Sequence, residues 1–430
     1  MLRLRVLLLA ALLLTFNVAI VTAQRQTGVI KSDELQKEIS ERKRIALENG
    51  NPLIELEFLR PYWGNSTIAP DVQQSIGYQL MNASAQIGNY AEALKYADEG
   101  RQWRTYKGRQ DDPKQLEGYK PIDGLKAILQ MSDSAQIILI NESHNVPQHR
   151  AFTYELLKAL RQKGFTHFAT ETLSEKDTGL NERGYPTKAT GFYTVEPVYG
   201  DLVRNAHKLG FRVVPYDWVG EYTPDNREQG QAKNLFERIL KNNPKAKILV
   251  HAGYDHINET GTLVGAKTMA QRLREITGID PLTIDQTVMT EHSAPEYEHP
   301  LYRYVMETNR ISRPSIFRNE KGGLWTLEKG KRDLTLITPR SVYKNGRPTW
   351  LRLGGDRKPY KLPKNICETA ARCLVRARVA GESTDAVPID QVEVVAKRGI
   401  PALMLPIGEY VLEVKDAADK MLMTSRIKLR

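Results

Sequence analysis

Cysteine is almost absent from this chain of 430 residues, which contains only Cys367 and Cys373. No further Cys or His lies close to the pair in the sequence, so a metal site built on these two thiols is excluded. In an oxidising compartment a Cys-x5-Cys pair can close a small loop, and the alternative is two unpaired buried thiols. We expect the disulfide.

Long apolar runs are absent after the N-terminal segment, so no later part of the chain is expected to cross a bilayer. The N-terminal segment itself has a secretory pattern. Arg3 and Arg5 precede an apolar run, and Val-Thr-Ala at 21–23 has the small-x-small form of a cleavage site. We therefore expect a signal peptide over residues 1–23, cleavage after Ala23, and a periplasmic or secreted mature protein.

Negative charge is scarce in one part of the chain. Residues 301–380 hold 19 Lys and Arg against 6 Asp and Glu, and the net charge of the whole chain is +11. In an exported protein such a surface suits anionic lipid headgroups, acidic glycans or an anionic substrate better than nucleic acid. The alternative is a solvated face without a partner. We expect contact with an envelope or other anionic surface through this basic C-terminal third.

The length exceeds that of a usual single core, so more than one domain is expected. Residues 24–120 are predicted to be helical, with helices at 33–47, 72–87 and 90–102. The sequence Gly-Asn-Tyr-Ala-Glu-Ala-Leu at 88–94 resembles the second-helix entry of a tetratricopeptide repeat. Because one copy cannot build a solenoid, we expect a helical hairpin packed on the main domain.

Residues 121–352 alternate between strand and helix patterns, which predicts an α/β domain with a parallel sheet flanked by helices. Residues 353–430 contain short strand-like runs typical of a small β-sandwich-like domain. The predicted strands of the α/β domain are 137–140, 165–170, 211–216, 246–251 and, more weakly, 334–338. Its predicted helices are 148–162, which Pro147 opens, 198–209, 228–241 and 266–276.

Four of the predicted strands end in residues that carry chemistry. The carboxyl ends of parallel strands share one edge of a sheet, where ligands of open α/β sheets bind. Six of the eight histidines lie between His144 and His256. One His alone is more often a hydrogen-bonded surface or core residue, but this convergence predicts a functional site. The groups expected at the edge are Asn141, Glu142, His144, Glu171, Asp217, His251 and His256.

Two kinds of chemistry fit these residue types. An imidazole such as that of His144 can act as a general base while Glu142 or Glu171 holds its tautomer. Equally, two or three imidazoles with one carboxylate can bind zinc or manganese with an open position for water. The helical His-Glu-x-x-His zinc motif is absent. Arg227 is a candidate for holding an anionic substrate group or a developing negative charge, the alternative being a solvated basic residue.

Four motifs in fixed order carry a family resemblance. They are Ile-Asn-Glu-Ser-His-Asn-Val-Pro-Gln-His at 140–149, Ala-Thr-Glu-Thr at 169–172, Asn-Arg-Glu-Gln-Gly-Gln-Ala-Lys-Asn at 226–234 and Val-His-Ala-Gly-Tyr-Asp-His at 250–256. The chain resembles the superfamily of erythromycin esterases, ChaN haem-binding lipoproteins and TraB/Tiki proteins over 137–257, with an extension to Trp350. Asn141 stands where the superfamily's first motif has Gly, and Gly230 and Gln231 depart from the esterases' helix motif.

The resemblance implies an EreA/ChaN-like fold and three possible activities. Esterase-like members activate water with an imidazole and require no metal, and the pocket would be lined by Glu142, His144, Glu171, Arg227 and His251. In Tiki-like members His144, Glu171 and His256 would bind a divalent metal for peptidase chemistry. ChaN-like members bind haem without catalysis, and Tyr254 would be the axial ligand.

The main expectation is an exported hydrolase in which His144 activates water for attack on an ester or amide carbonyl of a small-molecule or peptide substrate. A haem-binding protein and a metal-dependent peptidase are the alternatives. Aromatic residues near the expected site would either stack on a large ligand or cap the core. They are Tyr193, Tyr199, Tyr216, Trp218 and Tyr222.

Overall fold

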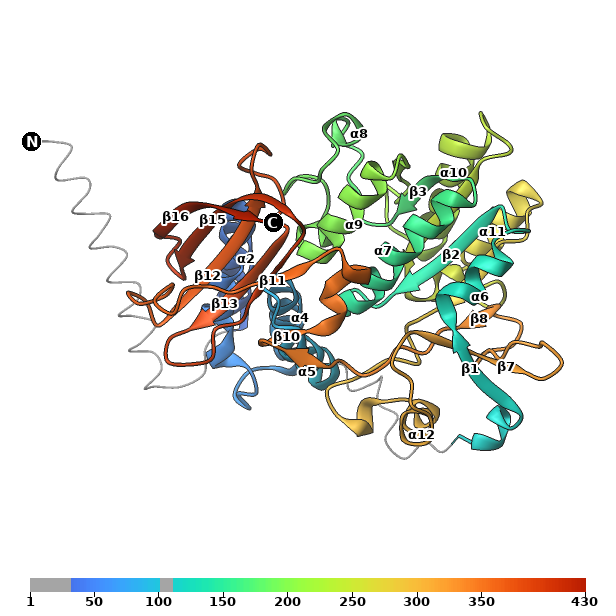
Figure 1. Cartoon of the computed structure of the whole chain (residues 1–430), viewed down its shortest axis with the longest axis horizontal. Helices are drawn as coiled ribbons and strands as arrows, with labels where there is room; N and C mark the ends of the chain where they lie inside the picture. Colours follow the sequence, from blue (N-terminus) through green and yellow to red (C-terminus); the bar gives the residue numbers. More distant parts are fainter. Residues whose placement is uncertain (1–31, 101–110) are drawn as a thin grey trace, which may run out of the picture.

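The structure is a computed structural model that describes residues 32–100 and 111–430 (Figure 1). The predicted signal peptide, residues 1–23, and the end of the predicted helix 90–102 lie outside the described residues. Within the described ranges, no helix combines the length and the apolar character needed to span a membrane.

A six-stranded parallel sheet forms the centre of the α/β part, with strand order β4-β3-β5-β2-β6-β8. Every residue of β2 is buried, which explains the unbroken aliphatic run in its sequence. The predicted α/β class, with a parallel sheet flanked by helices, is confirmed. The strands are β2 (Ile137–Glu142), β3 (Phe165–Thr170), β4 (Arg212–Pro215), β5 (Lys247–Gly253), β6 (Leu282–Asp285) and β8 (Leu334–Thr335).

Helices cover both faces of this sheet. Ile138 and Ile140 of β2 belong to one apolar core, whereas the alternate residues Ile137 and Leu139 belong to a second. Several of the helices begin at a proline, which lacks the N–H that a first turn leaves unpaired. On the first core lie α6 (Gly124–Met131), α7 (Pro147–Gln162) and α9 (Pro197–Lys208); on the second lie α10 (Pro224–Leu235), its π-helical continuation Phe236–Leu240, and α11 (Met269–Thr277).

One strand of the sheet has no counterpart in the sequence prediction. β6 pairs with β2 and connects it to the edge strand β8, which is only two residues long. A four-residue strand after Pro281 is too short to give a periodic signal. Outside the sheet, β1 (Tyr119–Asp123) pairs antiparallel with β7 (Ser315–Asn319), and α12 (Pro300–Thr308) lies between β6 and β7 in the sequence.

The C-terminal part contains the antiparallel strands that its sequence predicts. A four-stranded sheet has the order β13-β12-β15-β16, and separate two-stranded sheets pair β11 with β14 and β9 with β10. The strands are β9 (Tyr343–Lys344), β10 (Arg347–Pro348), β11 (Lys358–Tyr360), β12 (Arg372–Val379), β13 (Asp390–Val395), β14 (Leu403–Leu405), β15 (Gly408–Asp416) and β16 (Met421–Leu429).

The N-terminal helices lie beside this C-terminal sheet (Figure 1). Leu374 of β12 shares an apolar core with Leu56 and Leu80, and the Arg60 guanidinium donates to the Glu393 carboxylate at 2.7 Å. The hairpin also reaches the α/β part, where the Tyr90 hydroxyl lies 3.4 Å from Glu196. The hairpin therefore packs on the C-terminal sheet as well as on the α/β part, where it was expected. The helices are α2 (Ser32–Asn49), α3 (Leu53–Leu59), α4 (Pro70–Gln86) and α5 (Tyr90–Gly100).

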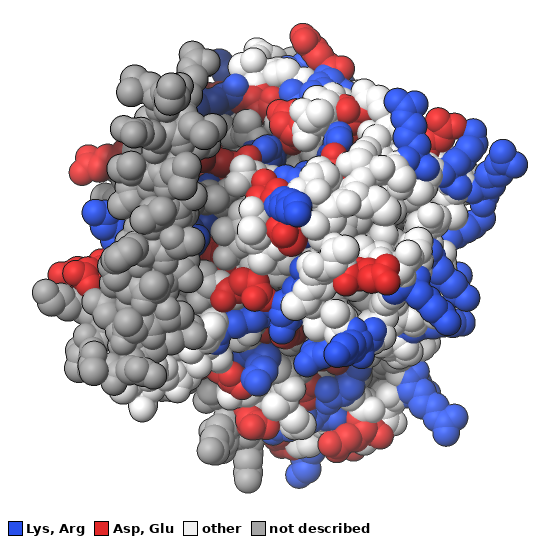
Figure 2. All heavy atoms as spheres, turned by 90° about the vertical axis from the view of Figure 1, so that its left-hand side faces the viewer, with Lys and Arg blue, Asp and Glu red and all other residues white. Residues whose placement is uncertain are grey.

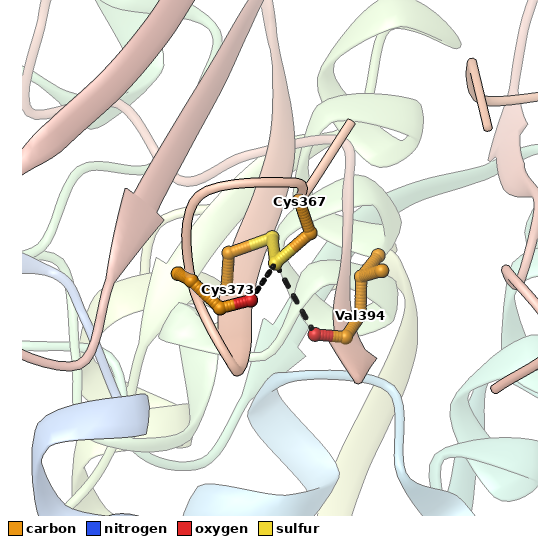
Figure 3. The surroundings of a disulfide bond; sticks show 4 residues. Cys367, Cys373 and Val394 are labelled. Carbon is orange, nitrogen blue, oxygen red and sulfur yellow. Dashed lines mark hydrogen bonds between the residues drawn. A yellow bond between two sulfur atoms is a disulfide. The ribbon is translucent and has the colours of Figure 1, made fainter. Parts of the chain in front are cut away.

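The predicted disulfide is confirmed. Cys367 and Cys373 are bonded, with their Cα atoms 5.9 Å apart, and the bond closes the loop that leads into β12 (Figure 3).

On the face of the molecule shown in Figure 2, Lys and Arg side chains gather along the right-hand edge.

Candidate active site

Glu142, the last residue of β2, is the centre of a buried polar cluster. Its carboxylate lies 2.9 Å from His144 Nδ1 and 2.9 Å from His251 Nε2, and it accepts two hydrogen bonds from the Arg150 guanidinium at 2.6 and 2.9 Å. Burial raises the pKa of Glu142, but Arg150, His144 and His251 outweigh burial and hold the pKa well below its usual value. The carboxylate is therefore ionised at neutral pH.

His144 is held in one orientation from three sides. Because an ionised carboxylate can only accept, a neutral His144 ring donates its Nδ1–H to Glu142 and keeps an unprotonated Nε2. The ring stacks on Tyr193, with centroids 4.2 Å apart and an interplanar angle of 19°, and Tyr254 meets its edge at 5.1 Å. The side chain of His144 is 15% exposed, so the site combines a fixed imidazole with access from solvent.

Glu171 follows β3 directly and is a second buried carboxylate at the same edge of the sheet. It accepts hydrogen bonds from the Arg227 guanidinium and from the backbone N–H of Gly253. Burial raises the pKa of Glu171, but His256, His144 and Arg227 outweigh it, so the pKa is lowered. The side chain of Arg227 keeps 27% of its surface exposed, so it is not sealed in the interior.

Gly253 shows how closely the two halves of the site approach each other. A β-carbon at this position would lie 2.8 Å from His144 Nε2 and 2.8 Å from Glu171 Oε2. The unprotonated nitrogen of His144 and the carboxylate of Glu171 therefore both lie next to the Cα of Gly253, on the side where a side chain would project. Only glycine leaves this space open.

The other two predicted histidines lie deeper. His251, in the middle of the sheet, is fully buried between Glu142 and Thr153, whose hydroxyl lies 3.2 Å from His251 Nδ1. His256 lies between two carboxylates, with Nδ1 2.5 Å from Glu228 and Nε2 3.7 Å from Glu171. Burial lowers the pKa of His256, but these two negative charges outweigh it and raise the pKa. His251 thus contacts Glu142, and His256 lies near Glu171, on the buried side of the site.

Asn141 and Asp217 also lie at this edge. Asn141 donates to Asp285 and to the Tyr254 carbonyl, both at 2.8 Å, and so ties β2 to β6 and to the segment after β5. Asp217 lies 3.7 Å from Arg227 Nε. The parallel sheet thus brings together all seven groups predicted from the strand ends, and Arg227 joins them from α10.

Three side chains make contacts at the site that the sequence did not assign to them, although Arg150 belongs to the polar cluster expected after the first strand and Tyr193 to the aromatic residues expected near the site. Arg150, on the first turn of α7, pairs with Glu142 at the end of β2 and with Glu196, the N-cap of α9. Tyr193 stacks on His144, and Asp285 ends the unpredicted strand β6. Arg150 belongs to the polar run after β2, but the sequence does not show that its side chain turns back toward the sheet. Tyr193 lies in a region without periodic pattern, so no signal places it on the imidazole.

A metal fits this arrangement poorly. A first shell made of His144, Glu171 and His256 would need the Glu171 carboxylate, yet the Arg227 guanidinium and the Gly253 N–H already occupy its two oxygens. His256 directs Nδ1 to Glu228. Among residues 32–100 and 111–430, no group of three His, Cys, Asp or Glu side chains is arranged to hold a metal ion.

Tyr254 lies at the edge of a polar cavity. Tyr254 packs against His144 and lines a neighbouring cavity of about 570 Å³ at the same edge of the sheet. The polar and charged side chains in this cavity include Asp98, Asp255, His292, Glu328 and Arg332.

Comparison with known proteins gives no family assignment. No family model matches the chain, and no curated protein matches it. Among solved structures, the type III effector HopBA1 matches with a TM-score of 0.32 and 12% identity over 52% of this chain and 98% of the effector. Two structures described as bacterial protein toxins each match with a TM-score of 0.29, at 18% and 16% identity. They cover 50% and 54% of this chain, and 44% and 53% of their own.

Proposed function

We propose that this protein is an exported hydrolase in which His144 activates water for attack on an ester or amide carbonyl. The observation that supports the proposal most directly is the Glu142–His144 pair. An ionised carboxylate 2.9 Å from Nδ1 fixes the tautomer that leaves Nε2 unprotonated, and Nε2 lies near Glu171 at Gly253. The resemblance of its motifs to the erythromycin esterases fits this proposal.

The reaction follows from these positions. Nε2 of His144 takes a proton from water as the water oxygen forms a bond to the carbonyl carbon, and Glu142 stabilises the resulting imidazolium. The Arg227 guanidinium stabilises the oxyanion of the tetrahedral intermediate. The bond from carbon to the leaving group then breaks, and the imidazolium returns its proton to the leaving oxygen or nitrogen. Atoms and charge balance with water as the only reactant besides the substrate.

The direct test is hydrolysis of p-nitrophenyl butyrate and of a matched anilide by the purified protein. His144→Ala is expected to lower turnover by about 10²–10⁴-fold, the usual contribution of a general base. His167→Ala is the matched control, because His167 lies on β3 and contacts Thr166, away from this cluster. Equal activity of His144→Ala and the unaltered protein would contradict the proposal.

The two alternatives have separate readouts. Activity that persists after extensive chelation supports the metal-free reaction, whereas loss on chelation and recovery with zinc would favour the Tiki-like peptidase with His144, Glu171 and His256 as ligands. A Soret band shift on mixing with haem, abolished by Tyr254→Phe, would favour the ChaN-like alternative. Export is tested by sequencing the N-terminus of the protein recovered outside the cytoplasm, which is expected to begin at Gln24.

A further inference from the structure

A second cavity, remote in sequence from the candidate active site, lies in the C-terminal part. Its volume is about 850 Å³, within the range of small-molecule sites. One wall is the loop after β11 that the disulfide closes, and the other is the turn between β13 and β14. We call it the basic cavity. The residues that define it are Lys361, Lys364, Cys367, Lys397, Arg398 and Ile400.

Positive charge dominates its rim. Lys361 and Lys364 on one wall and Lys397 and Arg398 on the other are all exposed, and Glu368 is the one acidic residue among those lining the cavity. None of the four cations forms an ion pair with a carboxylate of the described residues. Unpaired cations on both walls favour an anionic group between them.

The floor of the cavity is apolar. It consists of the side chains Leu362, Val394, Ile400 and Ala402 together with the disulfide. The Cys367 sulfur lies 3.6 Å from the carbonyl oxygens of Val394 and Ala370, so the disulfide rests against β13 (Figure 3). The bond thereby holds the loop wall at a fixed distance from the strand.

Lys397 also has an unusual backbone conformation. Its φ is +64°, a left-handed conformation that is uncommon outside glycine and asparagine. The residue two positions further on is Gly399, which takes no left-handed φ. The turn thus places a lysine rather than a glycine in the strained position, at the mouth of the cavity.

We propose that the basic cavity binds an anionic amphiphile, a molecule whose phosphate or carboxylate head contacts the four cations and whose apolar part covers the floor. Neither feature alone selects this class, because a solvated charge run needs no apolar floor and an apolar pocket needs no cations. Such a ligand could be presented by an acidic membrane or could be free in solution, and the chemistry of recognition is the same in both cases. The proposal is independent of hydrolysis at His144.

The test uses the full chain and two probes. Binding of monomeric dodecyl phosphate is measured by calorimetry, and binding to vesicles by sedimentation, with vesicles of phosphatidylcholine alone and of an equal mixture with phosphatidylglycerol. We expect binding to one or both of the anionic probes and none to neutral vesicles. Binding only to the vesicles identifies a membrane lipid as the ligand, and binding only to dodecyl phosphate identifies a soluble one.

Charge-reversal variants distinguish binding in the basic cavity from a general attraction of anions to a positively charged protein. Lys364→Glu with Lys397→Glu is expected to weaken binding at least about 30-fold, since each lysine near an anionic surface contributes about fivefold and more when reversed. The matched control is Lys158→Glu with Lys241→Glu, two exposed lysines of the α/β part that leave the same net charge. Ile400→Ser removes apolar floor without changing charge, and is expected to weaken dodecyl phosphate binding but not inorganic phosphate binding.

Three outcomes would overturn the proposal: no binding to either anionic probe, equal losses in the two charge-reversed variants, or inorganic phosphate binding as tightly as dodecyl phosphate. The last would show that the floor takes no part. Hydrolytic activity of the Lys364/Lys397 variant is measured in parallel and is expected to be unchanged, so failure here and failure of the proposed hydrolysis remain distinguishable.

Discussion

The geometry of the site depends on Gly253, because this residue has no side chain. The substitution Gly253→Ala would place a methyl group against the His144 imidazole and the Glu171 carboxylate, both of which are held by other partners. Displacement of the reacting groups by about 1 Å commonly costs about 10²-fold in rate. We therefore expect kcat to fall about 100-fold while the protein remains folded, as measured by circular dichroism and steady-state kinetics.

Gly399→Ala is the matched control for this substitution. Gly399 lies in the turn between β13 and β14 and does not adopt a left-handed φ, and a β-carbon at this position would have no neighbouring atom within 4 Å. Unchanged kinetics are expected. If Gly253→Ala were as active as the unaltered protein, the reaction would not depend on the positions of His144 and Glu171 next to this glycine.

Tyr193 is a second residue whose effect can be isolated. Its ring stacks on His144, and its hydroxyl lies 3.1 Å from that of Tyr78 on α4. Tyr193→Ala removes a stacking contact of about 0.5–1.5 kcal/mol and the lateral support of the imidazole, so kcat is expected to fall about tenfold. Tyr193→Phe keeps the ring and should recover most of the loss; equal defects in both variants would assign the effect to the hydroxyl.

At the scale of elements, the strands and helices were predictable where their pattern was long. β2, β3 and β5 could be placed from their aliphatic runs, and Pro147 marked the start of α7. β6 could not, because four residues give no period and only pairing with β2 makes them a strand. For the same reason the sequence predicted Asn141 at the edge but not its partner Asp285.

The contact between η6 (Tyr254–Ile257) and α10 gives a prediction about pH. His256 on η6 lies between Glu228 of α10 and Glu171, and its pKa is raised in the folded state. A raised pKa means that the folded state binds the proton more tightly than the unfolded state. Its contribution to stability is therefore fully present below the unfolded value near 6.5 and is lost as pH rises through the folded pKa.

The free energy of unfolding is accordingly expected to decrease as pH rises above neutral, by at most about 1.4 kcal/mol per pH unit for one proton. Urea titrations at several pH values measure it, and His256→Asn should flatten the slope. Glu55 must be separated from this effect. Burial raises the pKa of Glu55 to about 7, so its contribution is lost between 4.5 and about 7. A slope unchanged by His256→Asn but removed by Glu55→Gln would contradict the assignment.

At the scale of the whole molecule, the two ends of the described chain share one apolar core. Glu393 on β13 accepts hydrogen bonds from Arg60 next to α3, from Asn89 before α5 and from Arg372 on β12. Its side chain is 4% exposed. No sequence pattern predicts a contact between residues more than 300 positions apart. For this reason the sequence predicts packing of the hairpin on the α/β part alone.

Glu393→Ala is therefore expected to destabilise the protein by about 3 kcal/mol, because it leaves the largely buried Arg60 without its main carboxylate partner. Glu409→Ala, which removes an exposed partner of Lys428, is the control and should change stability little. Thermal unfolding followed by calorimetry measures both. Two separate transitions in the unaltered protein, with only one shifted, would show that the ends do not unfold together.

The hydroxyl contact between Tyr78 and Tyr193 has a consequence during biosynthesis. Tyr78 belongs to a hairpin that packs partly on β12 and β13, and these strands are synthesised after every residue of the candidate site. Until they emerge, the tyrosine behind His144 lacks its outer support. A growing polypeptide thus carries every side chain of the candidate site before it can hold Tyr193 in place, so the candidate site is completed late in synthesis.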